Sequence, residues 1–225
     1  MTRTKTPAAP SAQTVDTPAG PARITWHPAA GARLVLALGH GAGGGIEARD
    51  LQALAAALPA AGITVALVEQ PWRVAGKKVA AAPKVLDEGW RAVWPALAAP
   101  GLPVVAGGRS AGARVACRTA RELGAVAVLA LAFPLHPPGK PEKSRAAELT
   151  GTGVPTLVVQ GGRDPFGRPE EFPEGSFDLV EAAFGDHGFA VPKKAELGQE
   201  EVLASLTGAV ADWLAGQRAT GPGAG

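Results

Sequence analysis

Residues 104–112 read VVAGGRSAG, and this stretch decides the predicted fold. It begins with a short apolar run at 104–106, and a helical pattern starts near Ser110. Gly108, Ser110 and Gly112 fit the pattern G-x-S-x-G. A sharp turn from strand to helix strains the central residue, and flanking glycines remove the Cβ atoms that would collide there. The stretch therefore predicts a turn that exposes the Ser110 hydroxyl at a helix N-terminus, although Ser110 as an ordinary N-cap remains an alternative.

On both sides of this turn, short apolar runs alternate with longer amphipathic ones. The expected strands are 34–38, 63–68, 104–106, 126–133, 156–159 and 177–184, with a weaker leading strand at 23–27. The expected helices cover 51–58 and 86–97, begin near 110, and run from 199 to a stop at 216. Such alternation is typical of βα units, and strands that are apolar throughout are covered on both faces. The sequence predicts a three-layer α/β sandwich with a mostly parallel central sheet.

Length and composition fit one packed domain. The chain has 225 residues, 46% of them hydrophobic. Its 22 Lys and Arg against 20 Asp and Glu give a net charge of +2, too balanced for electrostatics alone to drive tight binding to nucleic acid or an anionic membrane. The single cysteine, Cys117, excludes an intrachain disulfide and a Cys-cluster zinc site, and we expect it to be a packing residue.

The two ends of the chain differ in composition from its middle. Residues 1–21 hold several prolines and almost no large apolar side chains, which predicts a disordered leader, and 217–225 form a Gly-rich tail that we expect to be flexible. The folded domain is then 22–216. No apolar stretch near the N-terminus fits a secretory signal, and no run reaches the roughly 18 residues of a membrane span, so we expect a cytoplasmic protein.

Polar residues that follow the apolar runs are the candidate site residues, because ligands bind at the carboxyl ends of parallel strands. Asp164 follows the run at 156–159, and His187 follows the run at 177–184. A serine nucleophile needs a histidine base, and that imidazole needs a carboxylate to orient it. The chain order Ser110, Asp164, His187 therefore predicts a catalytic triad. Asp186 is a weaker alternative for the carboxylate.

The glycine-rich segment at 39–45, GHGAGGG, has two interpretations. After a strand and before a helix it fits the dinucleotide pattern G-x-G-x-x-G, with Glu69 as the ribose ligand. It also fits an oxyanion loop, in which a backbone N–H of Ala42 or Gly43 acts together with that of Ala111. We favour the oxyanion loop, because a dehydrogenase has no need for the Ser, Asp and His set.

Four further polar residues are candidates for substrate binding. His40 and Arg109 belong to the two motifs themselves, whereas Arg73 and His136 follow other predicted strands. Arg73 is a candidate for a substrate carboxylate or for a neighbouring acidic side chain. His136 is a candidate for the pocket lining or for a surface turn rich in proline.

From about residue 30 to 215, the chain resembles the α/β-hydrolase superfamily. The strings that carry this resemblance are GHGAGGG, EQPWRVAGKKVAA, GGRSAGARVACR, LAFPLHPPGKPEKSR, GGRDPFG and GDHGF. More finely, it is similar to compact bacterial proteins related to dienelactone hydrolases and to the hydrolase-like domains of testis-expressed and NSL-complex regulatory proteins. The resemblance implies an eight-stranded fold and gives Ser110, Asp164 and His187 the roles of nucleophile, acid and base. It implies no particular substrate.

The expected protein is a carboxylesterase-like serine hydrolase without a cap domain. Only about 20 residues separate Phe133 from the next strand, too few for a lid, which favours a small ester, thioester or related acyl substrate. We expect no cofactor or metal. A non-catalytic binding or scaffold module is the first alternative, and an oxidoreductase that binds a dinucleotide is the second. The oligomeric state is left open.

Overall fold

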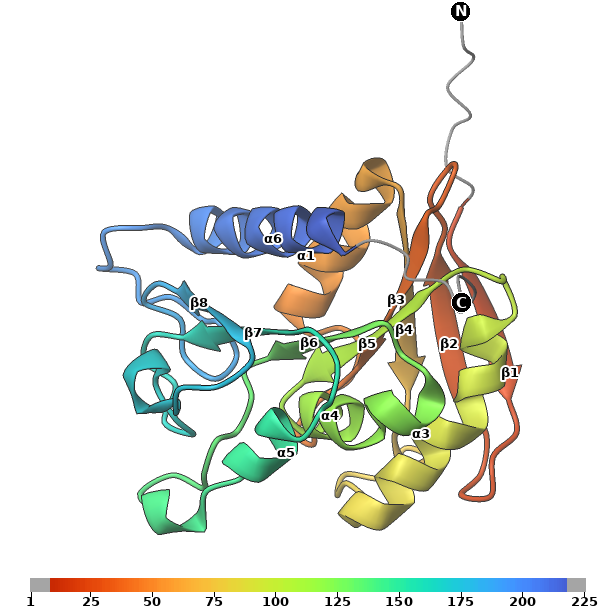
Figure 1. Ribbon diagram of the computed structural model, residues 1–225, viewed down its shortest axis with the longest axis horizontal. Coiled ribbons are helices and arrows are strands. Elements are labelled where there is room, and N and C mark those ends of the chain that lie inside the picture. The colour runs from red at the N-terminus through yellow and green to blue at the C-terminus, as the bar shows by residue number, and fades with distance from the viewer. Residues whose placement is uncertain (1–8, 218–225) are drawn as a thin grey trace, which may run out of the picture.

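The computed structural model describes residues 9–217, which form an eight-stranded sheet between two layers of helices (Figure 1). The strands are β1 (Ser11–Val15), β2 (Ala22–His27), β3 (Leu34–Gly39), β4 (Ile63–Glu69), β5 (Val104–Arg109), β6 (Ala127–Leu131), β7 (Thr156–Gly161) and β8 (Asp178–Ala182). They lie in the order β1-β2-β4-β3-β5-β6-β7-β8. Strands β3 to β8 pair in parallel, whereas β2 is antiparallel to both β1 and β4. The predicted fold class is confirmed.

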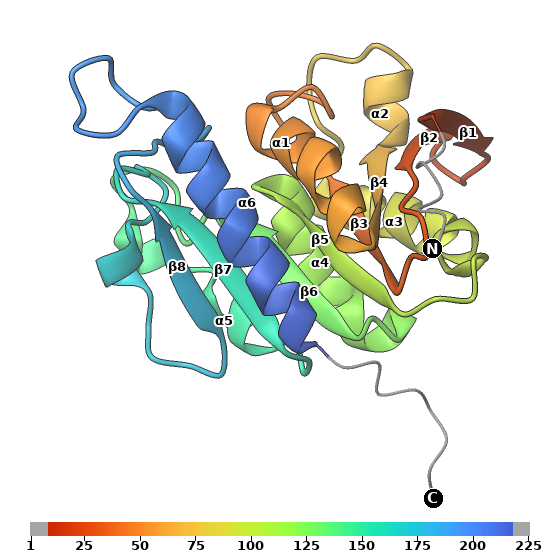
Figure 2. The same ribbon diagram turned by 90° about the horizontal axis from the view of Figure 1, so that it is seen from above.

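The helices cover the two faces of this sheet. They are α1 (Arg49–Ala57), α2 (Pro71–Val74), α3 (Pro83–Ala98), α4 (Ala111–Leu123), α5 (Ala146–Thr150) and α6 (Gln199–Gly216). Helices α1 and α6 lie on one face, as the view from above shows (Figure 2), and α3, α4 and α5 lie on the other. The four longer helices coincide with the four predicted ones, whereas the short α2 and α5 were not predicted.

Two hydrophobic cores fill the spaces between the layers. Side chains alternate across a strand, so β3 sends Val35 and Ala37 into the core under α3 and α4, while Leu36 and Leu38 enter the core under α1 and α6. All four side chains are fully buried. A strand buried on both faces must be apolar throughout, and for this reason the strands form continuous apolar runs in the sequence.

Most predicted boundaries differ from the structure by one or two residues, and the larger differences concern β5 and the expected leader. Strand β5 continues beyond the expected 104–106 to Arg109, because Gly107 and Gly108 keep pairing with β3 and β6 although glycine carries no strand signal. The predicted disordered leader is wrong for β1, which pairs along its whole length with β2. Backbone hydrogen bonds hold this polar edge strand, and the Trp26 indole donates to Gln13 Oε1 at 3.0 Å. Residues 1–8 of the expected leader and 218–225 of the expected tail lie outside the described residues.

No cap domain covers the sheet in the part of the chain that the structure describes. Between β6 and β7 the chain forms only a 3₁₀ turn at Pro141–Lys143 and the five-residue α5. In residues 9–217, no helix is both long and apolar enough to cross a membrane.

Gly112 tests the tight packing between β3 and α4. A Cβ at Gly112 would lie 2.5 Å from the carbonyl oxygen of Gly39, a backbone atom that cannot move aside without disturbing the sheet. We expect Gly112→Ala to lower the free energy of unfolding in urea by about 1–3 kcal/mol. Gly208→Ala is the matched control, because Gly208 has open space around it inside α6, and there alanine should stabilise by about 0.5–1 kcal/mol. Equal effects of the two substitutions would contradict this account.

Candidate active site

Ser110 lies at the turn between β5 and α4 in a strained backbone conformation. Its φ of 52° and ψ of −112° cost about 1–3 kcal/mol for a residue with a side chain. The turn is held by hydrogen bonds from Ser110 N to Leu131 O at 2.9 Å and from Arg114 N to Ser110 O at 3.2 Å. The Ser110 side chain makes no capping hydrogen bond to α4, so the alternative of an ordinary N-cap does not describe this geometry.

Glycines at 39 and 41 allow the segment 39–45 to pass close to this turn. A Cβ at Gly39 would lie 3.4 Å from the Cα of Gly112, and one at Gly41 would lie 3.4 Å from the Cβ of Ser110. Gly41 packs the more tightly of the two, since its Cβ would also lie 3.1 Å from Arg109 Nη1, whereas a Cβ at Gly39 would make only ordinary contacts. Glu69, the ribose ligand of the dinucleotide interpretation, lies instead 3.5 Å from Arg23 Nη1.

A chain of hydrogen bonds joins Ser110, His187 and Asp164. The His187 Nε2 atom lies 2.9 Å from Ser110 Oγ, and its Nδ1 atom lies 2.8 Å from Asp164 Oδ2. The neutral imidazole with its proton on Nδ1 fits both contacts, since Nδ1–H then donates to the carboxylate and Nε2 accepts from the hydroxyl. Three side chains that lie far apart in the sequence thus meet at the carboxyl end of the sheet.

Asp164 is fully buried and its carboxylate is held by several donors. Its Oδ1 accepts from the backbone N–H of Phe166 at 2.8 Å, and its Oδ2 accepts from Gln160 Nε2 at 2.9 Å in addition to His187. The alternative carboxylate, Asp186, is used differently, because its Oδ1 accepts from backbone N–H groups of its own loop. The structure thus places Asp164, and not Asp186, against the imidazole.

Two residues around His187 were missed by the sequence analysis. Gln160 lies on β7 with none of its surface exposed, and besides Asp164 it donates to Gly167 O at 2.7 Å. The Phe166 ring packs against the imidazole, with the ring centroids 4.2 Å apart and the planes tilted by 31°. A polar residue inside an otherwise apolar strand was the available signal for Gln160, whereas a phenylalanine in a loop gives none.

Three backbone N–H groups were expected to bind an oxyanion. Those of Ala42, Gly43 and Ala111 donate no hydrogen bond to any residue in the described range 9–217. Ala42 and Ala111 line the same cavity, whereas Gly43 is exposed and does not line it. The N–H of Ala111 belongs to the first residue of α4, where the helix dipole favours negative charge.

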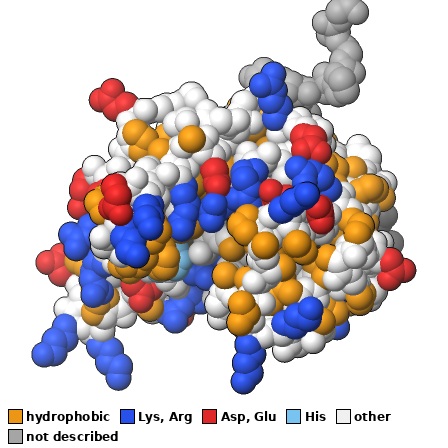
Figure 3. All heavy atoms as spheres, turned by 90° about the horizontal axis from the view of Figure 1, so that it is seen from below, with side chains coloured by type: hydrophobic (Ala, Val, Ile, Leu, Met, Phe, Trp, Pro, Cys, Tyr) orange, Lys and Arg blue, Asp and Glu red, His pale blue; other side chains and the backbone are white. Residues whose placement is uncertain are grey.

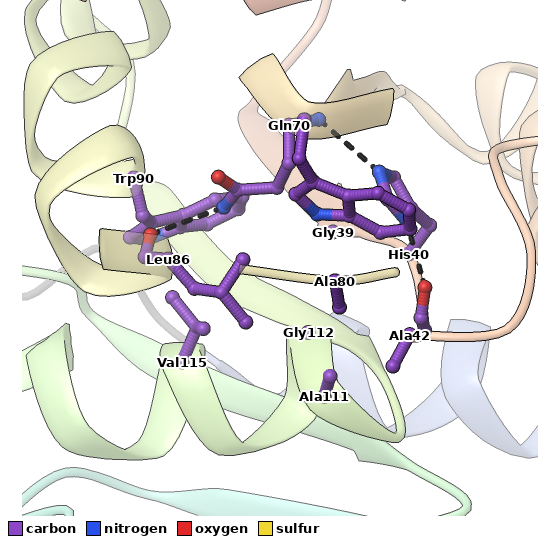
Figure 4. Close-up of a pocket in the computed structure, with 12 residues that line it drawn as sticks. Gly39, His40, Ala42, Gln70, Ala80, Leu86, Trp90, Ala111, Gly112 and Val115 are labelled. Atoms are coloured by element: carbon purple, nitrogen blue, oxygen red, sulfur yellow. Dashed lines mark hydrogen bonds between the residues drawn. The ribbon is translucent and has the colours of Figure 1, made fainter. Parts of the chain in front are cut away.

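That cavity is small and apolar, and Ala111 and Gly112, which directly follow Ser110, line it (Figure 4). Helix α3 contributes Leu86 and Trp90, helix α4 contributes Val115, and the segment before α3 contributes Ala80. The side chains of Leu86 and Val115 point toward its centre. A chemical group held here would contact hydrocarbon on most sides.

His40 lines the cavity, but both of its ring nitrogens form hydrogen bonds with backbone groups. Nε2 accepts from Gln70 N at 3.1 Å, and Nδ1 lies 2.9 Å from Gly41 O, to which it donates. Burial lowers the pKa of His40 below its usual value, which favours this neutral form. His40 therefore fixes the segment 39–45 and has no free ring nitrogen for a substrate.

Arg73, His136 and Cys117 lie outside this cavity. Arg73 Nη2 donates to Glu47 Oε1 at 2.7 Å in an exposed ion pair. His136 Nε2 lies 3.0 Å from Glu171 Oε2, and a backbone hydrogen bond to Pro137 together with Glu171 raises the pKa of His136. Burial raises the pKa of the Cys117 thiol to about 12, as suits a packing residue. Neither Arg73 nor His136 lines the cavity next to Ser110.

Arg109, the fourth candidate for substrate binding, is also absent from the cavity lining. Its guanidinium contacts Asp50 and the backbone of His187 instead.

On the face seen from below, a histidine lies in a recess flanked by hydrophobic side chains and by Lys and Arg (Figure 3). In the described part of the chain, no three His, Cys, Asp or Glu side chains gather in a way that could hold a metal ion.

Comparison with known proteins places the chain in one family. Residues 31–215 match a family model described as an alpha/beta hydrolase domain. One similar structure is a serine hydrolase without a lid from Xanthomonas campestris, with 23% identity and a TM-score of 0.68 over 92% of this chain and 96% of that one. Another is a serine hydrolase homologue from Coxiella burnetii, with 17% identity and a TM-score of 0.72 over 91% of this chain and 97% of that one. A dienelactone hydrolase from Anabaena variabilis is also similar (19%, 0.69, 92% and 97%). At these identities the likeness concerns the fold, and no match was found among curated proteins.

The buried neutral state of His40 predicts a pH dependence of stability. Because the pKa of His40 is lowered in the folded protein, the unfolded chain binds this proton first as the pH falls below 6.5. Its contribution to stability is therefore complete above pH 6.5 and is lost as the pH falls toward the folded pKa. We expect the wild type to lose more free energy of unfolding than His40→Gln between about pH 8 and about pH 5, measured by urea titration. The other histidines are common to both proteins, so parallel curves would contradict the prediction.

Proposed function

Because the chain belongs to the alpha/beta hydrolase domain family, and because Ser110, His187 and Asp164 are joined by hydrogen bonds of 2.9 and 2.8 Å, we propose that it is a serine hydrolase. The observation that carries the proposal is this chain of hydrogen bonds at a strained turn. A serine at its ordinary pKa is a weak nucleophile, and an adjacent imidazole oriented by a carboxylate activates it. The proposed substrates are small esters, thioesters or related acyl compounds.

In the first half of the reaction, Ser110 Oγ attacks the acyl carbon while His187 Nε2 takes the hydroxyl proton. The imidazolium that forms is stabilised by Asp164, whose buried carboxylate is already oriented by Phe166 N–H and Gln160. The tetrahedral intermediate then expels the alcohol or thiol, which receives the proton from Nε2. An acyl group remains on Ser110.

The negative charge of the tetrahedral intermediate falls on the former carbonyl oxygen. We infer that the N–H groups of Ala111 and Ala42 donate to it; both residues line the cavity beside Ser110, and neither N–H has another acceptor in residues 9–217. Donors fixed in advance stabilise a developing oxyanion without reorganising during the reaction.

The second half of the reaction repeats these steps with water. His187 Nε2 takes a proton from the water as its oxygen attacks the acyl carbon, and Ser110 Oγ then leaves with that proton. A carboxylic acid is released, and the enzyme returns to its starting state. Water is the only other reactant.

The cavity supports a small acyl group as the part of the substrate that is buried. Leu86, Trp90 and Val115 surround it with hydrocarbon, and its volume is limited by these side chains. No cap domain covers the site in the described residues, so the alcohol or thiol part would remain near solvent. We therefore propose selectivity for the acyl part over the leaving group.

A fluorophosphonate probe tests the nucleophile directly. We expect the probe to label Ser110 in the wild type, as shown by peptide mapping, and Ser110→Ala to lose both the label and at least about a thousandfold of ester turnover. Ser205→Ala is the matched control, because Ser205 is exposed on α6. No labelling of the folded wild type would contradict the proposal and favour a binding module instead.

Substitution of Leu86 tests the acyl cavity. Leu86→Ala removes a side chain that points into the cavity, so we expect the ratio of kcat/KM for hexanoate over acetate esters to rise by about tenfold. Leu97→Ala is the control, because Leu97 is buried on the same helix without lining the cavity. It should lower stability and leave the ratio unchanged. An unchanged ratio in Leu86→Ala would place the acyl group elsewhere.

A further inference from the structure

Arg109 precedes Ser110 directly, and its side chain connects two segments that meet at the site. The side chain is 13% exposed. Its Nε donates to Asp50 Oδ2 at 3.1 Å, and its Nη2 donates to the backbone oxygen of His187 at 2.5 Å. One planar guanidinium thus links the residue before the nucleophile to helix α1 and to the loop that carries the base.

The same guanidinium lies against the segment 39–45. A Cβ at Gly41 would be 3.1 Å from Arg109 Nη1, which is tighter than an ordinary contact. The position of Arg109 is therefore constrained by packing as well as by its two hydrogen bonds. A displaced side chain would disturb both the base and the segment that contributes Ala42.

Burial of the Asp50 carboxylate, the ion-pair partner of Arg109, costs desolvation free energy. It lies in the first turn of α1 with none of its surface exposed, and its Oδ1 has no hydrogen-bond partner among the described residues. Burial raises the pKa of Asp50, and the Arg109 charge opposes this rise. A buried ion pair contributes little net stability, because desolvation offsets most of the attraction. Stability alone thus gives a weak reason for this pair, whereas orientation of the guanidinium gives a direct one.

The imidazole of His187 is held by Asp164 and packs against Phe166, whereas the His187 backbone lies in a loop. The chain between β8 and α6 has no regular secondary structure at His187. Among residues 9–217, Arg109 is the only residue whose side chain forms a hydrogen bond with the backbone of His187. Asp186 instead binds N–H groups of the residues that follow.

We propose that Arg109 and Asp50 are a positioning pair that holds His187 at the correct distance from Ser110. Asp50 fixes the plane of the guanidinium, and the guanidinium fixes the backbone oxygen of His187. Neither residue lines the cavity beside Ser110, and in this proposal both act through the base. This inference rests on the serine-hydrolase function proposed above.

Arg109→Lys is the primary test, because lysine keeps the charge but has no planar fork to donate to two acceptors in fixed directions. We expect kcat and the rate of fluorophosphonate labelling to fall by about 10- to 100-fold, since a small misplacement of a catalytic group costs that much. The KM should change little, because Arg109 does not line the acyl cavity. Arg91→Lys is the matched control, as Arg91 forms a similar two-bond contact with Glu122 on the surface and should leave all three quantities unchanged.

Asp50→Asn provides a second variant of nearly the same shape. We expect it to lower kcat as well, and the double variant with Arg109→Lys to lose no more than the worse of the two, because the residues act as one unit. Urea unfolding of each variant separates misplacement of the base from loss of the folded state.

The outcomes separate the two proposals. If the wild type is labelled at Ser110 and the folded Arg109→Lys protein is labelled at the same rate, the positioning role is overturned and the hydrolase function stands. A rise in KM with unchanged kcat would also overturn it and would make Arg109 a substrate-binding residue. If the folded wild type is not labelled, both proposals fail.

Discussion

The close approach of the end of β3 to the start of α4 is the constraint on which the candidate site depends. The backbone of Gly39 comes so near to Gly112 that a side chain at Gly112 has no room without movement of the main chain. This contact allows Ser110 to take its left-handed conformation, and the hydrogen bond from Ser110 N to Leu131 O secures it from the neighbouring strand. The two hydrophobic cores hold the strands rigidly enough to maintain such local strain.

A second constraint is electrostatic, because the site places charge where water cannot reach it. Asp164 and Asp50 are both fully buried, but the hydrogen bonds to their carboxylates differ. Several donors surround the carboxylate of Asp164, whereas Asp50 relies mainly on Arg109 and leaves one oxygen without a partner. Buried carboxylates are costly unless they are paired, so such groups tend to mark places where geometry matters more than stability.

The sequence was sufficient to predict the sheet, the four longer helices and the residues that meet at the site, since apolar runs and strand-end positions are local signals. It failed where the cause is not local. Strand β1 is held by pairing with β2 and carries almost no apolar pattern of its own. The sequence also could not show the partners of Arg109 and His136, since Asp50 and Glu171 lie at distant positions. Such pairings depend on the folded chain and leave no periodicity in the sequence.

The short connection between β6 and β7 has a kinetic consequence. In many enzymes a lid must close before chemistry and open before release, and these motions then set the turnover rate. Here residues 132–155 form only a 3₁₀ turn and the five-residue α5, and no such element covers the sheet in the described chain. Entry and departure at this edge therefore need no opening of a lid formed by this connection.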